Sequence, residues 1–155
     1  MSIEIFDYIT NFKNPIMWKH VIIHHSLTKD GDVKDWTAIR NYHVRGLHFD
    51  DIGYHAGIEL VNGKLEYQIG RPLDMQGAHT LGMNDVAVGI CVVGNFDKES
   101  PAKQQYWLLA LLCKAFMRRF GIPIQNINFH RDFADKSCPG RRFEKMVLRD
   151  FIRTA

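Results

Sequence analysis

The chain has 155 residues, a length at which a single domain can bury a stable hydrophobic core without disulfide bonds or a structural metal ion. Its hydrophobic content of 46%, charged content of 24% and net charge of +3 are ordinary for a globular domain, and no apolar run approaches the roughly 20 residues that span a bilayer. We therefore predict one domain over residues 1–155, with 1–17 as a lead-in and 18–155 as the core, and we expect no stable membrane insertion.

The start of the chain and its cysteines bear on where the protein is made. The opening MSIEIFDYIT has an early acidic residue and no basic segment followed by an apolar one, so we expect no secretory signal and a cytoplasmic protein at synthesis. Three cysteines without such a signal argue against a disulfide framework. Cys91 and Cys113 lie in apolar runs and are predicted to be buried, whereas Cys138 lies among polar and turn-forming residues.

In chain order, the first predicted element is a short helix before Asn14-Pro15. The β-branched, apolar run Lys19 to His25 then predicts a buried strand. This strand leads into a loop with a turn at Asp30-Gly31. Asp35 can cap a helix that runs to about Gly46.

The middle of the chain carries the clearest strand signals. The dipeptide Asn62-Gly63 separates Gly53–Leu60 from Lys64–Ile69 and predicts a β-hairpin. The glycine-rich stretch GRPLDMQGAHTLGMND has no periodicity and predicts a surface loop of a length that is often functional. Val86–Val93 is apolar throughout, which predicts a central strand with parallel neighbours.

The last third predicts two helices and one short strand. A long helix is expected from Ser100-Pro101 to about Phe120, ended by Gly121. Residues 124–129 predict a strand that delivers His130, and residues 141–153 predict the final helix. Strands mixed with helices, plus one hairpin, predict an α/β fold: a single domain with a central mixed β-sheet flanked by helices.

Two candidate metal ligands lie close together in residues 128–140, NFHRDFADKSCPG. His130 and Cys138 lie eight positions apart on an irregular segment, so both side chains can face one divalent ion. Zinc takes nitrogen and sulfur ligands at about 2.0–2.1 Å and about 2.3 Å respectively. A third ligand would come from VIIHHS, as His24 or His25, and strand parity does not choose between them because the preceding residues are apolar on both faces.

The C-terminal part is basic. From Lys114 onward the chain has ten lysine and arginine residues against four acidic ones. Such a segment can favour an anionic polymer, either nucleic acid or a bacterial wall, or it can be an ordinary solvated surface. The sequence has no helix-turn-helix, zinc-finger or single-strand-binding signature, so we expect no nucleic-acid partner.

Five ordered motifs give the chain a family resemblance. IHHS, GYHAGIE, GRPLDMQGAH, the segment from Asn84 through VGICVVGNF, and HRDFADKSCPG occur in the order found in zinc-dependent N-acetylmuramoyl-L-alanine amidases. The resemblance covers roughly residues 21–140 and is nearest to small phage amidase lysozymes and peptidoglycan recognition proteins. It implies an amidase fold, a Zn²⁺ cofactor, and cleavage of the amide between N-acetylmuramic acid and the L-alanine of the stem peptide.

The resemblance also implies roles for particular residues. In this family the first histidine after the apolar strand, the histidine of HRD and the cysteine of CPG bind zinc, which corresponds to His24, His130 and Cys138. Three protein ligands leave one zinc position open for water, as in catalytic sites. The tyrosine of GYH and the lysine two positions before the cysteine correspond to Tyr54 and Lys136, which the resemblance implies are catalytic.

Other polar residues have weaker expectations. On this view His25 is a core or supporting histidine, Asp132 shapes the ligand loop, and His20, His43 and His48 have no role in the site. The weaker candidates for substrate binding are His55, Arg71, His79 and Asn84.

Two alternatives remain open at this point. The first is a phage or prophage endolysin, acting as a monomer on bacterial peptidoglycan or on muropeptides after its release from the cytoplasm. The second is a non-catalytic peptidoglycan-binding module, whose members usually lack the cysteine that this chain keeps as Cys138. Cytoplasmic recycling amidases are also similar but typically have aspartate at that position.

Overall fold

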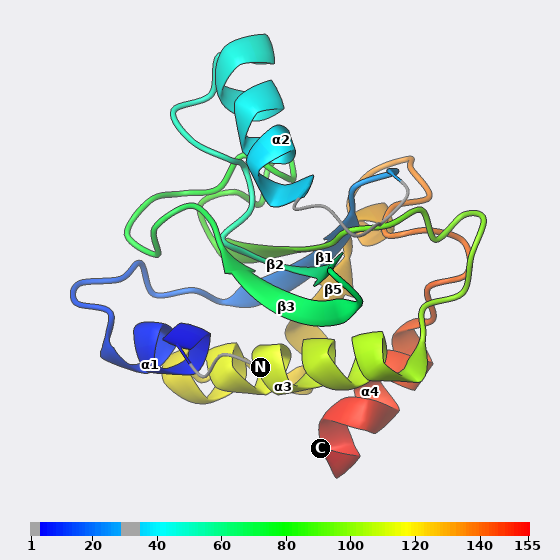
Figure 1. The fold of residues 1–155 in the computed structure, drawn as a ribbon. Helices are drawn as coiled ribbons and strands as arrows, with labels where there is room; N and C mark the ends of the chain where they lie inside the picture. The colour runs from blue at the N-terminus through cyan, green and yellow to red at the C-terminus, as the bar shows by residue number, and fades with distance from the viewer. Residues whose placement is uncertain (1–3, 29–34) are drawn as a thin grey trace.

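The computed structural model describes residues 4–28 and 35–155, which fold as a single α/β domain around a five-stranded mixed sheet (Figure 1). The strand order is β3-β2-β4-β1-β5. β1 is parallel to both of its neighbours, β4 and β5, while β2 is parallel to β4 and antiparallel to β3. The mixed sheet predicted from sequence is confirmed. The strands are β1 (His20–His25), β2 (Ala56–Val61), β3 (Lys64–Ile69), β4 (Ala87–Val92) and β5 (Ile127–Phe129).

Helices cover both faces of this sheet (Figure 1). α1, α3 and α4 lie on one face, and α2 projects from the other. None of the described helices is both long and apolar enough to span a membrane. The helices are α1 (Glu4–Asn11), α2 (Asp35–Asn41), its π-helical continuation η1 (Tyr42–Gly46), α3 (Lys103–Phe120), the 3-10 turns η2 (Ile124–Asn126) and η3 (His130–Asp132), and α4 (Lys145–Thr154).

The alternation of side chains along the central strands separates the core from the functional face. Val21 and Ile23 of β1 belong to the large core cluster that also contains α1, α3 and α4 residues. His24 and its register partner Cys91 on β4 lie on the opposite face, where Cys91 packs with Trp36 of α2. The predicted burial of Cys91 and Cys113 is confirmed. The side chain of His24, near the end of the buried strand β1, is thus directed toward the α2 side of the sheet.

α2 is held close to the sheet by a glycine and a carboxylate. A Cβ on Gly57 of β2 would lie 2.3 Å from the Trp36 ring, so only glycine permits this approach. Glu59 of β2 accepts the backbone amides of Asp35 and Trp36, at 2.8 and 3.2 Å. The sequence suggested Asp35 as the cap, but the carboxylate that binds these first amides is that of Glu59, from a distant strand. The turn predicted at Asp30-Gly31 lies outside the described residues.

Most predicted elements are confirmed, but several boundaries are wrong. β2 begins at Ala56 rather than at Gly53, and of the strand predicted over residues 124–129 the first three form the 3-10 turn η2, so that β5 begins at Ile127. Asn62 and Gly63 have φ of 50° and 76°, as the predicted two-residue hairpin turn requires, and Gly121 ends α3 with φ of 69°. The final helix begins at Lys145 rather than at residue 141. Residues 141–144 form a turn instead, because the carbonyls of Gly140 and Phe143 are bound by the Arg131 guanidinium, at 2.7 and 2.8 Å.

Candidate metal centre and cleft

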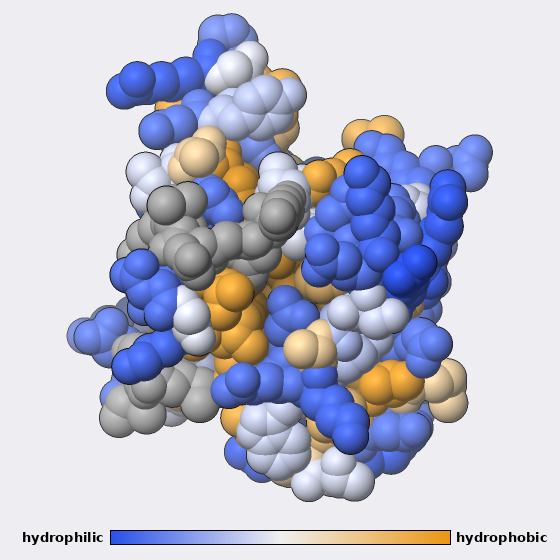
Figure 2. All heavy atoms as spheres, turned by 45° about the vertical axis from the view of Figure 1, so that its right-hand side comes forward, coloured by the Kyte–Doolittle hydropathy of each residue, from blue (hydrophilic) through white to orange (hydrophobic). Residues whose placement is uncertain are grey.

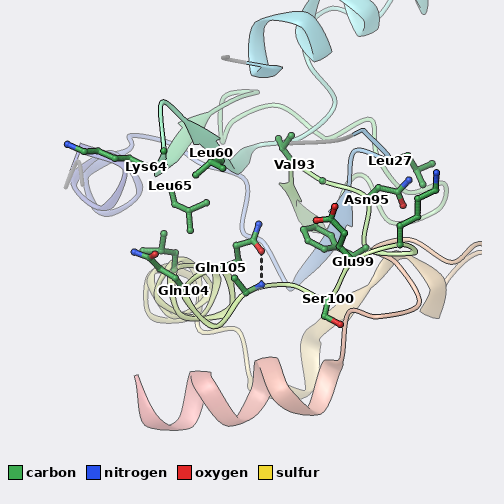
Figure 3. A pocket seen from close by; sticks show the side chains of 16 residues that line it. Leu27, Leu60, Lys64, Leu65, Val93, Asn95, Glu99, Ser100, Gln104 and Gln105 are labelled. Atoms are coloured by element: carbon green, nitrogen blue, oxygen red, sulfur yellow. Dashed lines mark hydrogen bonds between the residues drawn. The ribbon is translucent and has the colours of Figure 1, made fainter. Parts of the chain in front are cut away.

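Two cavities open on the described surface, and the candidate metal ligands line only one of them. On the face in Figure 2, hydrophobic side chains gather in the middle, with hydrophilic residues around them. The larger cavity, about 970 Å³, lies between the β2–β3 turn, residues 93–100 and the start of α3, and is lined by aliphatic and amide side chains together with Lys64, Lys98 and Glu99 (Figure 3). The smaller, about 560 Å³, lies over the end of β1. Leu27 borders both, but the histidines and Cys138 line only the smaller one, here called the cleft.

Three side chains from distant parts of the chain meet at the base of this cleft. His24 is near the end of β1, His130 follows β5 directly, and Cys138 lies in the turn beyond it. Their ligating atoms all lie within 4.8 Å of one another, and Cys138 Sγ is 3.7 Å from His24 Nδ1. Nitrogen and sulfur ligands of one tetrahedral zinc ion are about 3.6 Å apart, given zinc's bond lengths. The structure therefore brings together a group that can hold one metal ion.

The geometry distinguishes His24 from His25, which the sequence alone could not do. The His25 ring lies on the other face of the sheet, where it stacks on Phe96 and its Nδ1 accepts the Phe96 amide at 3.2 Å. The backbone N–H of His25 donates to Cys138 Sγ at 3.4 Å. His25 thus contacts the cysteine through its amide, while the imidazole of His24 faces it.

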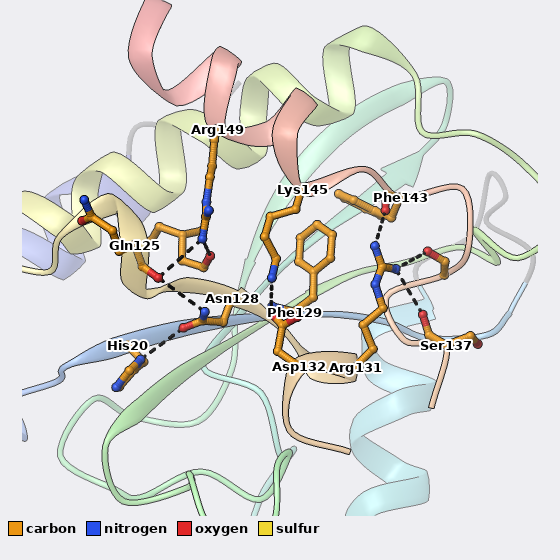
Figure 4. A network of polar contacts seen from close by, with 12 residues as sticks. His20, Gln125, Asn128, Phe129, Arg131, Asp132, Ser137, Phe143, Lys145 and Arg149 are labelled. Carbon is orange, nitrogen blue, oxygen red and sulfur yellow. Dashed lines mark hydrogen bonds and ion pairs between the residues drawn. The ribbon is translucent and has the colours of Figure 1, made fainter. Parts of the chain in front are cut away.

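Arg131 and Asp132 hold the loop that carries the second and third candidate ligands (Figure 4). Besides the carbonyls of Gly140 and Phe143, the Arg131 guanidinium binds the Ser137 carbonyl at 3.4 Å. The Arg131 amide also donates to the Cys138 carbonyl at 2.9 Å. Asp132 accepts the Phe129 amide at 2.8 Å and pairs with Lys145, a supporting contact of the kind expected from sequence.

Much of the C-terminal basic charge is used inside the fold. Lys114, Arg119 and Arg149 donate to backbone carbonyls, and Arg153 pairs with Asp150. Lys114 and Arg149 thus tie the last helix to α3 and β5, and Arg131 and Lys145 hold the ligand loop. Arg119 binds the end of α1 and the residue that follows it, whereas the Arg153 pair lies within α4 on the exposed surface. The structure therefore favours neither of the two simple expectations, an open polymer-binding face or a purely solvated one.

Burial sets the protonation of the three candidate ligands. It holds the pKa of His24 well below its usual value, with further lowering by His79 and His130. It also lowers the pKa of His130, with a smaller contribution from Lys136. Both rings are therefore neutral at pH 7 and have a lone pair for a cation. Burial raises the pKa of the Cys138 thiol to about 11, so a cation that binds there must displace a proton.

Tyr54 and Lys136 lie at the same cleft. The Tyr54 ring centroid is 5.1 Å from that of His24. Burial, with Cys91 and Cys138 nearby, raises the pKa of Tyr54 well above its usual value, so its hydroxyl remains a donor. Lys136 is exposed at the cleft wall, and among the described residues its ammonium group has no ion-pair partner. A hydroxyl donor and an uncommitted positive charge thus accompany the candidate metal ligands.

His43, for which the sequence predicted no role in the site, lies on the cleft wall. Its Nδ1 accepts the Gly53 amide at 2.9 Å, which leaves Nε2 as the N–H of the neutral ring. Its ring centroid is 5.5 Å from that of Tyr54. Helical spacing from Ile39, which also lines the cleft, was the available signal, but spacing alone does not show which helix face meets the site.

Of the four weaker candidates, only His79 lines the cleft. Arg71 lies beneath it and donates to the carbonyls of Ile52, Gln76 and Asp51, at 3.0, 2.8 and 3.1 Å. These three bonds use its guanidinium to hold the 70–85 loop against the segment that precedes β2.

The other two weaker candidates are also supports. His55 is 1% exposed, accepts the Gly89 amide at Nδ1 (3.1 Å) and donates from Nε2 to the Met75 carbonyl (2.9 Å). Asn84 Oδ1 accepts the amides of His79 and Thr80, at 2.8 and 2.9 Å. Both residues fix the position of the loop that presents His79.

Comparison with known proteins agrees with this architecture. Residues 13–141 match the sequence profile of N-acetylmuramoyl-L-alanine amidase. The chain is 33% identical over 126 residues to the endolysin of Klebsiella phage KP32, covering 77% of this chain and 78% of that protein. It is 34% identical over 92 residues to peptidoglycan-recognition protein 2 of Holotrichia diomphalia, covering 56% of this chain. The chain spans only 48% of that insect protein and 59% of peptidoglycan-recognition protein LB of Drosophila melanogaster.

Solved structures of both kinds share the fold. The amidase LysC from Clostridium intestinale is 25% identical with a TM-score of 0.73, over 89% of this chain and 87% of that one. A mutant of Drosophila PGRP-LB in complex with tracheal cytotoxin is 29% identical with a TM-score of 0.69, over 85% of this chain and 79% of that one. The same framework therefore occurs in proteins named as amidases and in proteins named for recognition.

Proposed function

This chain belongs to the N-acetylmuramoyl-L-alanine amidase family, and from that premise we propose that it is a zinc-dependent peptidoglycan hydrolase. Its reaction is the cleavage of the amide between N-acetylmuramic acid and the L-alanine of the stem peptide. One observation carries the proposal: the ligating atoms of His24, His130 and Cys138 lie within 4.8 Å of one another at the base of an open cleft. A site with three protein ligands is typical of catalytic rather than structural zinc.

The residues around the cleft have different roles in the proposed reaction. His24, His130 and Cys138 would hold the ion, which when bound supplies Lewis acidity and makes hydroxide available near neutral pH. Lys136 places a positive charge where the amide oxygen becomes an oxyanion, a contribution of about 2.7–4 kcal/mol for one such stabiliser. Tyr54 offers its hydroxyl hydrogen to the same region, and His43, whose ring centroid lies 5.5 Å from that of Tyr54, presents a neutral N–H to the same cleft.

The cleft also suits the substrate class. Its walls are largely apolar, with Ile39, Tyr42, Leu47 and Phe49 contributed by α2, η1 and the segment after them. Such walls bind the alanine methyl groups and aliphatic stems of a muropeptide, while the polar residues at the base orient its amide. We propose peptidoglycan or its muropeptides as the substrate and a monomer as the acting species. We also propose synthesis in the cytoplasm and action on the wall after release, as in a phage or prophage endolysin.

A non-catalytic recognition module is the second candidate, because many of the similar proteins are named for recognition. Such a module needs the cleft but not the ligands at its base. Cys138 supports the hydrolase over the recognition module, because its Sγ faces His24 and belongs to the ligand group, which a pure binding site does not require.

Digestion of purified peptidoglycan tests the proposal. The zinc-loaded protein should lower the turbidity of a wall suspension, and chelation or the Cys138→Ala substitution should abolish this clearing. Zinc added after chelation should restore it to the wild type but not to the variant. Wall pelleting with no clearing, or clearing that survives both treatments, would favour recognition alone or a different mechanism.

A further inference from the structure

We propose that His79 positions the metal ligand His24 by fixing which of its two ring nitrogens carries the proton. This inference rests on the proposed metal site, but it concerns a residue outside the ligand group. The sequence suggested His79 only as a weak substrate contact. In the structure its ring meets that of His24 edge to face, with centroids 4.8 Å apart.

The hydrogen bonds of His79 have a defined direction. Its Nε2 lies 3.0 Å from the Ala87 carbonyl oxygen, and since a carbonyl can only accept, Nε2 carries the hydrogen. No described carboxylate is bonded to this ring, whose partners are the carbonyl, the Thr80 hydroxyl and His24. In the neutral ring the other nitrogen, Nδ1, is then a bare acceptor.

That acceptor determines the state of His24. Nδ1 of His79 lies 2.8 Å from Nε2 of His24, so His24 must donate from Nε2. Its Nδ1 is then free of hydrogen, and this is the nitrogen that lies 3.7 Å from Cys138 Sγ. The chain Ala87 carbonyl–His79–His24 therefore directs a lone pair into the ligand group before any metal binds. Metal-ligating histidines commonly donate their second N–H to a carboxylate, a carbonyl or water, and here a second imidazole accepts it.

The His79 ring occupies a space shaped for it. A Cβ added at Gly77 or at Gly89 would lie 2.5 Å from His79 Cδ2, so a side chain at either glycine would displace the ring. Asn84 Oδ1 binds the His79 amide from the loop side. Thr80 Oγ1 lies 2.9 Å from His79 Nδ1 and 3.3 Å from His24 Nε2, close enough to interact with the same pair. Two glycines and the Asn84 side chain thus hold the ring against His24.

Nitrogen NMR of the metal-free protein at constant neutral pH reads this tautomer directly. In the wild type, His24 should carry hydrogen on Nε2, with a ¹⁵N–¹⁵N coupling through the hydrogen bond to His79 Nδ1. His79→Phe keeps a ring of similar size but has no acceptor, and His24 should then populate the Nδ1–H form. His79→Asn offers an amide oxygen near the position of Nδ1 and should restore the Nε2–H form. The through-bond coupling needs no variant, so a folding defect in His79→Phe leaves the test intact.

Zinc affinity supplies the second readout. Loss of a partner that orients a metal-ligating histidine typically costs 10–100-fold in affinity, so His79→Phe should weaken zinc binding by about that factor and His79→Asn by less. His20→Phe is the matched control, since it makes the same substitution at a histidine that bonds Asn128 and does not line the cleft, and it should bind zinc within a few-fold of wild type. Absence of the coupling in wild type, or His79→Phe with the Nε2–H tautomer and undiminished zinc affinity, would overturn the proposal. A wild type that shows the tautomer but cleaves no peptidoglycan would leave this inference standing and remove only the proposed reaction.

Discussion

Cys138 Sγ lies 3.7 Å from His24 Nδ1, although 114 positions separate the two residues. Parallel pairing of β1 with β5 brings them together, because the loop after β5 then returns over the end of β1. A ligand group of this kind exists only in the folded chain. Binding of an ion to it is therefore coupled to folding.

The first prediction is that zinc stabilises the wild type against denaturant. At a free concentration one hundred times its dissociation constant, zinc should add about 2.7 kcal/mol to the free energy of unfolding. Cys138→Ala should lose most of this gain, whereas Ser137→Ala, one position away, should keep it. Urea unfolding with and without zinc measures the difference. Equal zinc stabilisation of wild type and Cys138→Ala would show that the cysteine is not a ligand.

The second prediction concerns Lys136. Lys136→Met keeps the aliphatic stem but removes the charge, and kcat on peptidoglycan should fall by about 10²-fold. Zinc content should not change, since Lys136 is not one of the three grouped ligands. Lys98→Met is the matched control, because that lysine is also exposed but lines the other cavity. A similar loss in both variants would indicate a general charge effect on binding to the wall.

The third prediction is that Arg131 is required for the shape of the ligand loop. Arg131→Met would leave the carbonyls of Gly140 and Phe143 without their charged donor, and each lost bond of this kind costs about 1–3 kcal/mol. We expect a loss of about 2–4 kcal/mol in unfolding free energy, together with weaker zinc binding. Arg118→Met, at an exposed position of α3, should change stability by less than about 0.5 kcal/mol. If the two variants are equally stable, the loop does not depend on Arg131.

The fourth prediction is a loss of stability in acid that originates at His55. Burial lowers the pKa of His55 from 6.5 to about 4. Below pH 6.5 the unfolded chain therefore binds a proton that the folded chain does not, so stability falls from about pH 6.5 down to about pH 4. A shift of this size corresponds to about 3 kcal/mol over the whole window. Urea unfolding of metal-free protein across this range measures it. His55→Gln, which has no group that titrates there, should show a shallower decline, and parallel curves would contradict the assignment.

The sequence was sufficient for features whose signals are local. Asn62-Gly63 predicted its hairpin because few residue pairs adopt two successive positive φ values. The ligand group was predictable in a similar way, since His130 and Cys138 lie within one short segment and the family resemblance supplied His24.

Features set by contacts between distant segments were not predictable. Glu59 binds the start of α2 from another strand, and Arg131 converts the predicted first turn of the last helix into a loop. His43 and His79 belong to the same class. Their positions at the cleft depend on which face of a helix, or which end of a loop, meets β1, and no periodicity in a single segment specifies that.

The most direct test of the account is to identify the new ends made when the zinc-loaded protein acts on purified peptidoglycan, with the metal content of the protein measured in parallel. The account predicts about one zinc ion per chain and new free amino groups on L-alanine. It predicts no new reducing sugar ends, and that product formation stops on chelation and resumes when zinc is added. Stoichiometric zinc and tight wall binding without any new L-alanine amino groups would contradict it.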